Sequence, residues 1–405
     1  MRFYCKKQEE GHFFMICYAD NFAPDADGRC RTTMAALRLQ MAELKPELAF
    51  KPEYAASDET FSLWQKKVRA RLEERLKMPP VDPSQPPPKI LKKEPRDGYT
   101  LEHWELYPDK WSAVPFMLLR PDHVQTPMPA VICIPGSHHP REVLAGEPLP
   151  DHPNCKNIRF LDRNRMAQVF AQAGYLAVAF DNPATATIAE KDSDGNENVW
   201  RCRIRTVQAM LGSGTTYPGY SVFHKKLILD WLTGLPEVDN SRIAVSGHSL
   251  GTEAALALGV LDERISAVIF NDYVGDDRRR YCATTEMETE EIQDLGSWHF
   301  VPGMWRDFAF PDLLISLAPR YLTMNEGGAE EFLDLIRSAY AARGCADRLQ
   351  VAYYPDLLDK PKIKENVPMQ GLSPDGFFKH CSVIPADHSF RIAPSLELLK
   401  KAFGK

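Results

Sequence analysis

The sequence contains no long hydrophobic run and no cluster rich in Lys and Arg. No stretch approaches the roughly 20 apolar residues of a membrane-spanning helix. The formal net charge of the 405 residues is -6, and the lack of a basic run argues against nucleic acid or an anionic membrane surface as the main partner. We therefore expect a small-molecule or carbohydrate-sized substrate, no nucleic acid and no membrane.

Cysteine is present without the spacing of a functional motif. The nine cysteines are scattered and include no CxxC pair, so neither a disulfide framework nor a zinc knuckle is indicated. The first 22 residues contain an apolar run of only about eight residues, preceded by Glu10 and followed by Asp20, which is poor for a signal peptide. These features favour reduced thiols and a cytoplasmic protein.

A glycine-rich dinucleotide loop is also missing. The densest glycine stretch, LGSGTTYPG at residues 211–219, follows no predicted strand and lacks GxGxxG spacing. We therefore reject a Rossmann dehydrogenase, although its sheet pattern would fit, and no cofactor is indicated.

One short segment is dense in proline. Residues 79–89, PPVDPSQPPPK, contain six prolines, which prohibit both a helix and a central strand. Residues 32–77 carry apolar positions at helical spacing. We expect residues 1–95 to form a helical extension with a proline-rich connector, and residues 96–405 to form the main domain. The extension could dock on the main domain or mediate dimerisation, so a homo-oligomer is one expectation.

Strand and helix patterns alternate beyond the connector. Residues 129–136, PAVICIPG, and residues 242–247, RIAVSG, are apolar runs typical of strands buried on both faces. The alternation predicts an α/β fold with a doubly wound, mostly parallel sheet. An irregular insertion at 273–318 interrupts it, and its aromatic residues predict either a lid or substrate wall, or a cluster tied to the core. These residues are Trp298, Phe300, Trp305, Phe308 and Phe310.

The motif GHSLG, residues 247–251, lies where a buried strand meets an apolar helix. Gly247 and Gly251 would remove the Cβ atoms that collide when a strand turns abruptly into a helix. Ser249 would then present its hydroxyl at a helix N-terminus, where the N–H of Leu250 is placed to bind an oxyanion. The motif predicts that Ser249 is a nucleophile; the alternative is a glycine-rich packing turn.

A second oxyanion donor is expected from CIPGSHHP, residues 133–140, which follows the first long apolar run. The backbone N–H of Ser137 or His138 could supply it, unless the segment is an ordinary Gly-Ser turn. The adjacent His138 and His139 have no HExxH motif and no carboxylate partner nearby, so no metal site is predicted.

Two late histidines compete for the role of general base. His388, in IPADHSFR, lies in a loop that leads to the last predicted helix, where the base of a Ser-acid-His order belongs. His380, in FFKHCS, has aromatic neighbours suited to packing. We therefore favour His388.

The acid is less sharply indicated. Glu330 has the best spacing after the predicted strand at 320–325, Glu326 is the runner-up, and Asp272 at the end of the preceding strand is a third candidate. A different interpretation of Glu330 and Glu331 is a first-turn carboxylate pair that opposes the helix dipole.

With these segments placed, the sequence resembles the α/β-hydrolase superfamily, in particular the branch related to acetyl xylan esterases and dienelactone hydrolases. VICIPGSHHPREVLAGEP, IAVSGHSLGTEAALAL and ADHSFR carry the resemblance, which runs from about residue 100 to the end. It implies Ser249 as nucleophile, His388 as base and an acid at Glu330. Relatives commonly have an Asp at the acid position, and PGSHHP replaces the more usual His-Gly oxyanion sequence.

The combined prediction is a serine hydrolase that cleaves carboxylic esters through an acyl-enzyme. The resemblance favours short acyl, acetyl-type esters of carbohydrates or small molecules. A prolyl-oligopeptidase-like peptidase would use the same fold and triad, but the sequence lacks the β-rich repeats of a propeller. A non-catalytic binding protein that retains the fold is the alternative from a different class.

Overall fold

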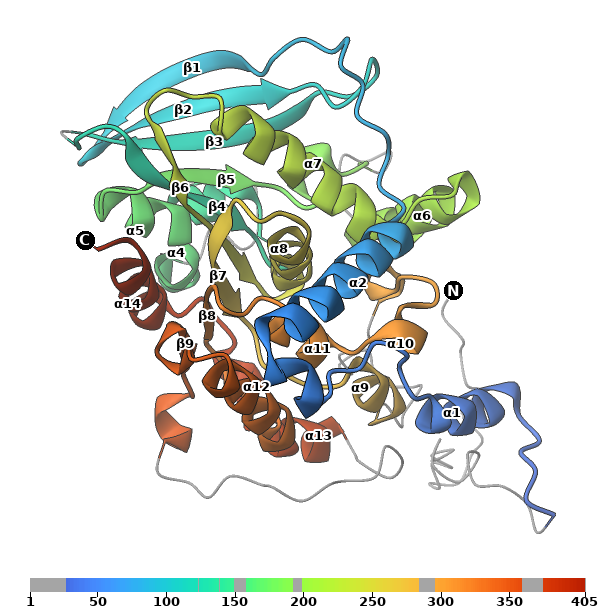
Figure 1. The fold of residues 1–405 in the computed structure, drawn as a ribbon. Helices are drawn as coiled ribbons and strands as arrows, with labels where there is room; N and C mark the ends of the chain where they lie inside the picture. The colour runs from blue at the N-terminus through green and yellow to red at the C-terminus, as the bar shows by residue number, and fades with distance from the viewer. Residues whose placement is uncertain are drawn as a thin grey trace, which may run out of the picture.

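A computed structural model describes residues 27–122, 124–137, 139–148, 158–191, 199–283, 296–358 and 374–404 (Figure 1). Strands within these residues form one nine-stranded sheet. They are β1 (Lys89–Arg96), β2 (Tyr99–Leu106), β3 (Val114–Pro121), β4 (Met128–Ile134), β5 (Leu176–Phe180), β6 (Val238–His248), β7 (Ile265–Asn271), β8 (Tyr321–Met324) and β9 (Leu349–Val351). Their order in the sheet is β1-β2-β3-β5-β4-β6-β7-β8-β9.

The pairing separates an antiparallel edge from a parallel centre. β1 to β3 pair antiparallel with one another, and β3 pairs antiparallel with β5. From β5 through β4, β6, β7 and β8 to β9 every pairing is parallel. The carboxyl ends of these parallel strands meet at one edge of the sheet, where loops from several strands converge. The predicted mostly parallel α/β sheet is confirmed.

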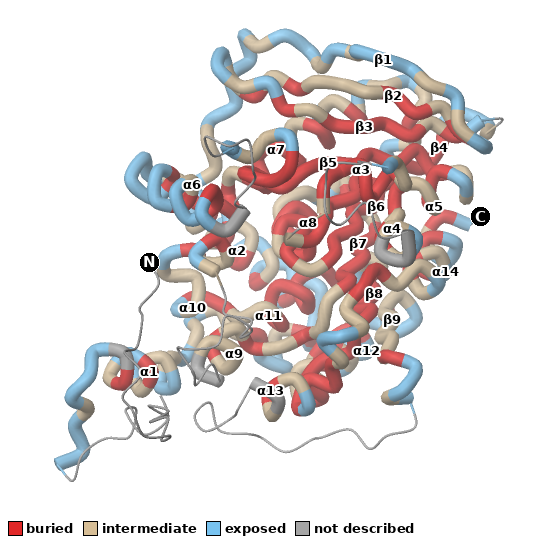
Figure 2. The backbone as a smooth tube through the Cα atoms, turned by 180° about the vertical axis from the view of Figure 1, so that it is seen from behind, coloured by how far each residue is buried: buried red, intermediate tan, exposed pale blue. Residues whose placement is uncertain are grey.

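Helices lie on both faces of this sheet (Figures 1 and 2). They are α1 (Thr33–Glu43), α2 (Asp58–Leu76), α3 (Arg141–Ala145), α4 (Ile158–Asn164), α5 (Met166–Gln172), α6 (Val199–Ser213), α7 (Tyr217–Leu232), α8 (Leu250–Leu261), α9 (Asp277–Ala283), α10 (Met304–Asp307), α11 (Phe310–Ile315), α12 (Glu330–Ala342), α13 (Pro374–His380) and α14 (Ile392–Phe403).

Two hydrophobic clusters fill the space between the sheet and its helices. Every residue of β4 is buried, and its side chains alternate between the two clusters. Ile132 belongs to the cluster that includes buried residues of α2, α7, α8, α11 and α12, whereas Val131 belongs to the cluster with residues of α3, α5 and α14. A strand buried on both faces needs apolar residues at successive positions, which explains the continuous run in its sequence.

The N-terminal helix α2 packs into the larger of the two clusters. Trp64 and four other apolar residues of α2 are buried there, and the indole Nε1 of Trp64 donates to the carbonyl of Leu48 at 2.9 Å. Arg71 and Arg75 of α2 contact the buried carboxylate of Asp307. The helix α2 is therefore docked on the main domain through apolar and charged contacts.

The predicted division at residue 95 falls inside β1. This strand pairs with β2 and extends the sheet at its edge, where Figure 2 shows it mostly exposed. Its sequence, KILKKEPR, has no apolar run because an edge strand with few buried side chains does not need one. Pro95 is tolerated there because an edge strand leaves some N–H groups without a ladder partner.

Replacing Trp64 with Ala is expected to destabilise the whole fold. The indole is 3% exposed, and emptying a buried Trp site typically costs about 3–5 kcal/mol of unfolding free energy. The neighbouring Leu63 is 54% exposed, so Leu63→Ala should stay within about 0.5 kcal/mol of the parent. Urea unfolding followed by circular dichroism measures both variants. If both variants lost the same small amount of unfolding free energy, α2 would not be part of the main core.

The aromatic residues of the 273–318 insertion fall into two groups. Trp298 and Phe308 are buried, at 1% and 0% exposure, as expected of a cluster tied to the core. Phe300, Trp305 and Phe310 are partly exposed and line a cavity. The insertion forms short helices in its described part; residues 284–295 lie outside it. The cluster tied to the core therefore describes Trp298 and Phe308, whereas a lid or substrate wall stays a prediction for the other three.

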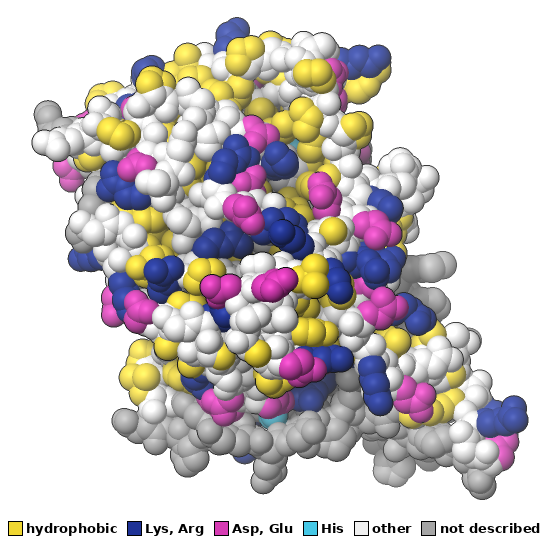
Figure 3. Space-filling view, viewed as in Figure 1, with side chains coloured by type: hydrophobic (Ala, Val, Ile, Leu, Met, Phe, Trp, Pro, Cys, Tyr) yellow, Lys and Arg dark blue, Asp and Glu magenta, His cyan; other side chains and the backbone are white. Residues whose placement is uncertain are grey.

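The surface and the thiols have few distinguishing features. Basic and acidic side chains are interspersed on the face shown in Figure 3. Cysteines 30, 133, 202, 345 and 381 are free thiols.

Within the part of the chain that the structure describes, no helix combines the length and the apolar character needed to cross a bilayer.

Candidate active site

Ser249 occupies a sharp turn between β6, which ends at His248, and α8, which begins at Leu250. Its φ of 52° and ψ of -125° lie outside the conformations that non-glycine residues commonly adopt. A Cβ on Gly247 would lie 2.5 Å from the carbonyl oxygen of Gly251, and a Cβ on Gly251 would lie 2.4 Å from that of Ile134. The turn therefore requires glycine at both positions, as the GxSxG spacing predicts.

Gly251→Ala should disrupt this turn. The added methyl group meets backbone carbonyls that cannot rotate away, so we expect a loss of about 1–3 kcal/mol of stability or more. Gly212 in α6 provides the control because its added Cβ would meet no atom within 4 Å, and Gly212→Ala should stabilise by about 0.4–1 kcal/mol. Thermal unfolding of the two variants tests the contrast. A stable Gly251→Ala protein with parental properties would contradict the tight packing.

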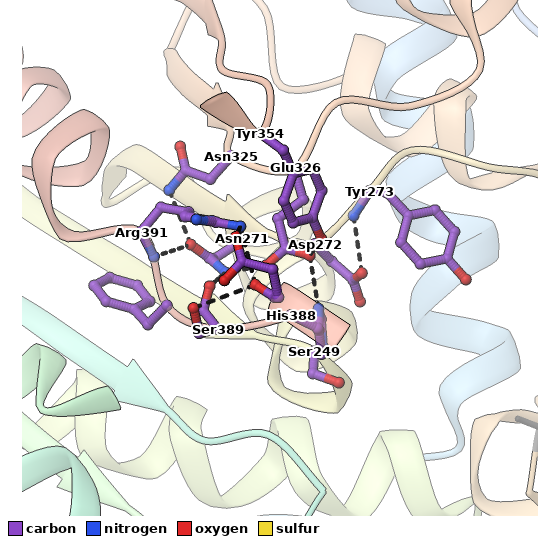
Figure 4. Close-up of polar contacts among 12 residues, drawn as sticks. Ser249, Asn271, Asp272, Tyr273, Asn325, Glu326, Tyr354, His388, Ser389 and Arg391 are labelled. Carbon is purple, nitrogen blue, oxygen red and sulfur yellow. Dashed lines mark hydrogen bonds and ion pairs between the residues drawn. The ribbon is translucent and has the colours of Figure 1, made fainter. Parts of the chain in front are cut away.

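The partly exposed His388 and the buried Glu326 form a pair beside Ser249 (Figure 4). The Nδ1 atom of His388 lies 2.6 Å from Oε2 of Glu326, which follows β8 and is 0% exposed. The hydroxyl of Tyr354 donates to the same oxygen at 2.6 Å, and Nδ2 of Asn271 donates to Oε1 at 3.1 Å. A carboxylate with these three partners is held in one orientation and remains an acceptor toward His388.

The environment stabilises the charged form of His388. Burial acts to lower the pKa of the imidazole, but the hydrogen bond to Glu326 and the negative charges of Glu326 and Asp272 act in the opposite direction and raise it above its ordinary value. The imidazolium that forms when a histidine accepts a proton is therefore favoured at this position. Burial in turn raises the pKa of Asp272 to about 6.

Glu330, which spacing favoured as the acid, does not contact His388. It is the first residue of α12, and its carboxylate accepts from Nη1 of Arg337 at 3.0 Å and contacts the hydroxyl of Tyr353. Gly327, with a φ of 70°, turns the chain between Glu326 and α12. The structure therefore brings Glu326, the runner-up, to His388 and leaves Glu330 in a separate group, because this turn keeps the residue nearest the strand end at the sheet edge.

His380, the other candidate for the base, and Asp272, the third candidate for the acid, make different contacts. His380 in α13 contacts Glu331 through its Nε2 atom at 3.0 Å. Asp272 interacts with His388 through its charge, while its Oδ1 accepts from the backbone N–H of Tyr273 at 2.8 Å. The structure therefore brings His388 and Glu326 together and leaves His380 in a separate pair.

The loop after β4 lies directly against Ser249. A Cβ on Gly136 would be 3.3 Å from the Cβ of Ser249. Nδ2 of Asn182 donates to the carbonyl of Pro135 at 2.7 Å, and the guanidinium of Arg203 contacts the carbonyl of Ser137. The loop is thus held close to the serine, and Leu250 follows the serine as the first residue of α8. His138, the other predicted donor, lies outside the described residues.

His248 is a feature that the sequence analysis did not single out. Its ring is 2% exposed and lies between two other imidazoles, with ring centres 4.8 Å from His388 and 5.2 Å from His139. Burial and the charges of His388 and His139 lower its pKa well below the ordinary value. The neutral form of His248 is therefore favoured. In the sequence, only its position next to Ser249 in GHSLG could have indicated that His248 lies in the site.

A metal could use the donors of His248, Glu326 and His388, which lie within 4.8 Å of one another. Both oxygens of Glu326 already accept hydrogen bonds, including the 2.6 Å contact with His388. A cation at this point would have to break that contact, so we interpret His388 and Glu326 as a hydrogen-bonded pair against which the ring of His248 stacks.

A parallel sheet with a serine at a strand-to-helix elbow and a histidine-carboxylate pair on later loops is typical of an α/β-hydrolase. The chain belongs to the Abhydrolase family, whose profile matches residues 16–401. The predicted resemblance to the α/β-hydrolase superfamily is confirmed. None of the curated proteins matches the chain in sequence.

Solved structures agree with this assignment. A Bacteroides fragilis protein that is provisionally described as an acetyl xylan esterase is 30% identical, with a TM-score of 0.85 over 96% of this chain and 100% of that chain. A glucuronoyl esterase from Solibacter usitatus is 16% identical, with a TM-score of 0.51 over 77% and 94%. A promiscuous CE15 esterase from a marine bacterial metagenome is 13% identical, with a TM-score of 0.52 over 89% and 97%. The last two share the fold.

Proposed function

We propose that the protein is a serine carboxylesterase in which Ser249 is the nucleophile, His388 the general base and Glu326 the acid. The observation that carries this proposal is the 2.6 Å contact between His388 and the fully buried Glu326, next to a serine in a strained elbow. A base that is oriented by a third group beside a nucleophile is the arrangement of nucleophilic catalysis.

The proposed reaction proceeds through two tetrahedral intermediates. Nε2 of His388 accepts the proton of Ser249 as Oγ attacks the ester carbonyl, and the N–H of Leu250 and one from the loop containing Ser137 and His138 bind the oxyanion. The imidazolium then donates its proton to the leaving alcohol. His388 next activates water, which attacks the acyl-enzyme and releases the acid.

The 30% identical Bacteroides fragilis protein favours acetyl esters of carbohydrates or small molecules as the first substrates to test. Glu326 holds Nδ1 of His388, so the remaining ring nitrogen is free to serve the reacting atoms. The same machinery could cleave amides, and a peptidase would be recognised by that activity.

The test combines covalent labelling with turnover. The purified protein is treated with a fluorophosphonate probe, and the adduct is located by peptide mapping; hydrolysis of acetate esters and of matched acetamides is measured in parallel. We expect an adduct on Ser249 and turnover of esters in excess of amides. Faster cleavage of amides would indicate a peptidase. A folded protein without adduct or turnover would overturn the proposal in favour of a binding protein.

A further inference from the structure

We infer that His248 is a positioning residue, whose ring holds the imidazole of His388 in the plane from which its Nε2 atom can reach Ser249. This inference rests on the proposed function and adds a residue to the same site. The proposed reaction uses the ring of His388 and has no step for His248. That side chain is nevertheless 2% exposed and lies directly before the serine in the sequence.

The hydrogen bond to Glu326 leaves the ring of His388 incompletely fixed. Oε2 of Glu326 lies 2.6 Å from Nδ1 and so holds one atom of the ring. Hydrogen bonds to an sp² oxygen tolerate a range of angles, and the outer side-chain torsion of a histidine has only broad preferences. The side chain of His388 is also 28% exposed, so the protein does not enclose it on every side. A second contact is therefore needed to set the plane of the ring.

His248 supplies this second contact. Its ring centre is 4.8 Å from that of His388, and the two ring planes are inclined by 30°. Rings at this separation and inclination pack through their faces. If the ring of His388 turned about its Cβ–Cγ bond, its edge would move into the ring of His248. The contact therefore restricts the torsion that the hydrogen bond to Glu326 leaves free.

The ring of His248 is itself held in place. Its residue is the last of β6, where its backbone is in register with Asn271 of β7. The ring also stacks on His139 of the loop after β4, with ring centres 5.2 Å apart and planes inclined by 14°. A Cβ on Gly136 of that loop would lie 3.1 Å from Nδ1 of His248. The ring cannot move far without displacing the strand or the loop, so it is a fixed support for His388.

The contribution of His248 comes from the face of its ring. Neither ring nitrogen has a hydrogen-bond partner among the described residues, although one of them lies within 4.8 Å of a carboxylate oxygen of Glu326. Burial lowers the pKa of this imidazole well below its ordinary value, and the positive charges of His388, His139 and Arg391 act in the same direction. A neutral ring does not repel the imidazolium that forms on His388 during the reaction, whereas a charged ring would.

The test replaces His248 by residues that remove or keep a flat side chain. His248→Leu keeps an apolar side chain without a planar face, so the ring of His388 should lose its fixed orientation. We expect kcat for an acetate ester to fall about 10- to 100-fold, because a displacement of about 1 Å can cost about 10²-fold. KM should change little, since the base acts in the transition state. His248→Phe restores a ring and should recover most of the lost kcat.

A phenyl ring is larger than an imidazole and can overpack a buried site, so His248→Asn is a second planar variant. Its flat amide is smaller than the imidazole, and its kcat should exceed that of His248→Leu. Thermal unfolding establishes that each variant is folded. An unchanged kcat in His248→Leu, or equal losses in all folded variants of His248, would overturn the inference.

His224→Leu is the matched control. His224 in α7 is also 2% exposed, and neither of its ring nitrogens has a hydrogen-bond partner among the described residues. Its ring packs against Tyr220, with ring centres 4.7 Å apart, and makes no contact with the proposed triad. The same change of a buried imidazole to leucine should therefore leave kcat and KM close to the parental values. An equal fall of kcat in both leucine variants would show a general effect of the lost imidazole and overturn the inference.

Proton NMR separates this inference from the proposed reaction, because it needs no turnover. The Nδ1 proton that His388 shares with Glu326 gives a resolved signal only while it exchanges slowly with water, and His388→Ala assigns that signal. We expect the signal in the parent and in His248→Phe, and its loss in His248→Leu. If the parent hydrolyses no ester, this pattern still supports the positioning role. A parent without the signal, or a signal unchanged in His248→Leu, overturns it.

Discussion

Ser249→Ala is expected to abolish the fluorophosphonate adduct and to lower kcat for ester hydrolysis by about 10⁴- to 10⁶-fold. The substitution removes the only atom that can form the acyl-enzyme in the proposed reaction. The backbone N–H of Leu250 and the loop after β4 remain, so residual binding of the carbonyl should keep a small rate above the uncatalysed one. Steady-state kinetics with an acetate ester and intact-protein mass spectrometry measure the two effects.

Ser246→Ala is the matched control for this experiment. Ser246 lies three residues earlier on β6 and is fully buried, whereas Ser249 is partly exposed; Oγ of Ser246 contacts Sδ of Met166 at 3.4 Å. The same atoms are deleted, but no group of the proposed triad is changed. Turnover and labelling of Ser246→Ala should remain close to the parental values. Labelling that persists in Ser249→Ala would place the nucleophile elsewhere.

Glu326→Gln is expected to lower kcat by about 10³- to 10⁴-fold while the protein remains folded. Glutamine keeps the size of the side chain but lacks the negative charge that stabilises the imidazolium of His388. Its amide can also present a donor to Nδ1 and favour the wrong tautomer of the ring. The measurement is kcat across a pH series, with thermal unfolding to establish that each variant is folded.

The pH profile gives an independent readout of the same variant. His388 acts as a base when it is neutral, so kcat/KM should rise with pH through its pKa, which the surroundings raise above the usual 6.5. Removing the charge of Glu326 lowers that pKa, and the rising limb should move to lower pH. Glu330→Gln, four residues later, should leave both the rate and the profile close to the parental ones. A large loss in Glu330→Gln and none in Glu326→Gln would reverse the assignment of the acid.

Local sequence pattern was sufficient for the central sheet and the elbow. A strand buried on both faces needs a continuous apolar run, and β4, β6 and β7 each show one. The turn at Ser249 needs small residues at fixed offsets, and Gly247 and Gly251 supply them. These requirements act over fewer than about ten residues, so they can be read without knowledge of the rest of the chain.

Elements whose stability comes from distant contacts were harder to predict. β1 exists because β2 pairs with it, and its own charged sequence gives no strand signal. The α6 helix was likewise not anticipated, although its Arg203 contacts the carbonyl of Ser137 in the loop beside the serine. Propensity and periodicity describe a segment alone, whereas these contacts join segments far apart in sequence.

The amino-acid sequence by itself determined the fold class and named Ser249 and His388 as the candidates for nucleophile and base. Only the tertiary structure decided which carboxylate meets the histidine, since Glu326 and Glu330 are four residues apart and 62 residues separate Glu326 from His388. Only the tertiary structure also revealed the imidazole stack around His248 and the apolar cavity along α8. The physical reason is that a site depends on distances between side chains from different elements, and those distances are set by how the elements pack.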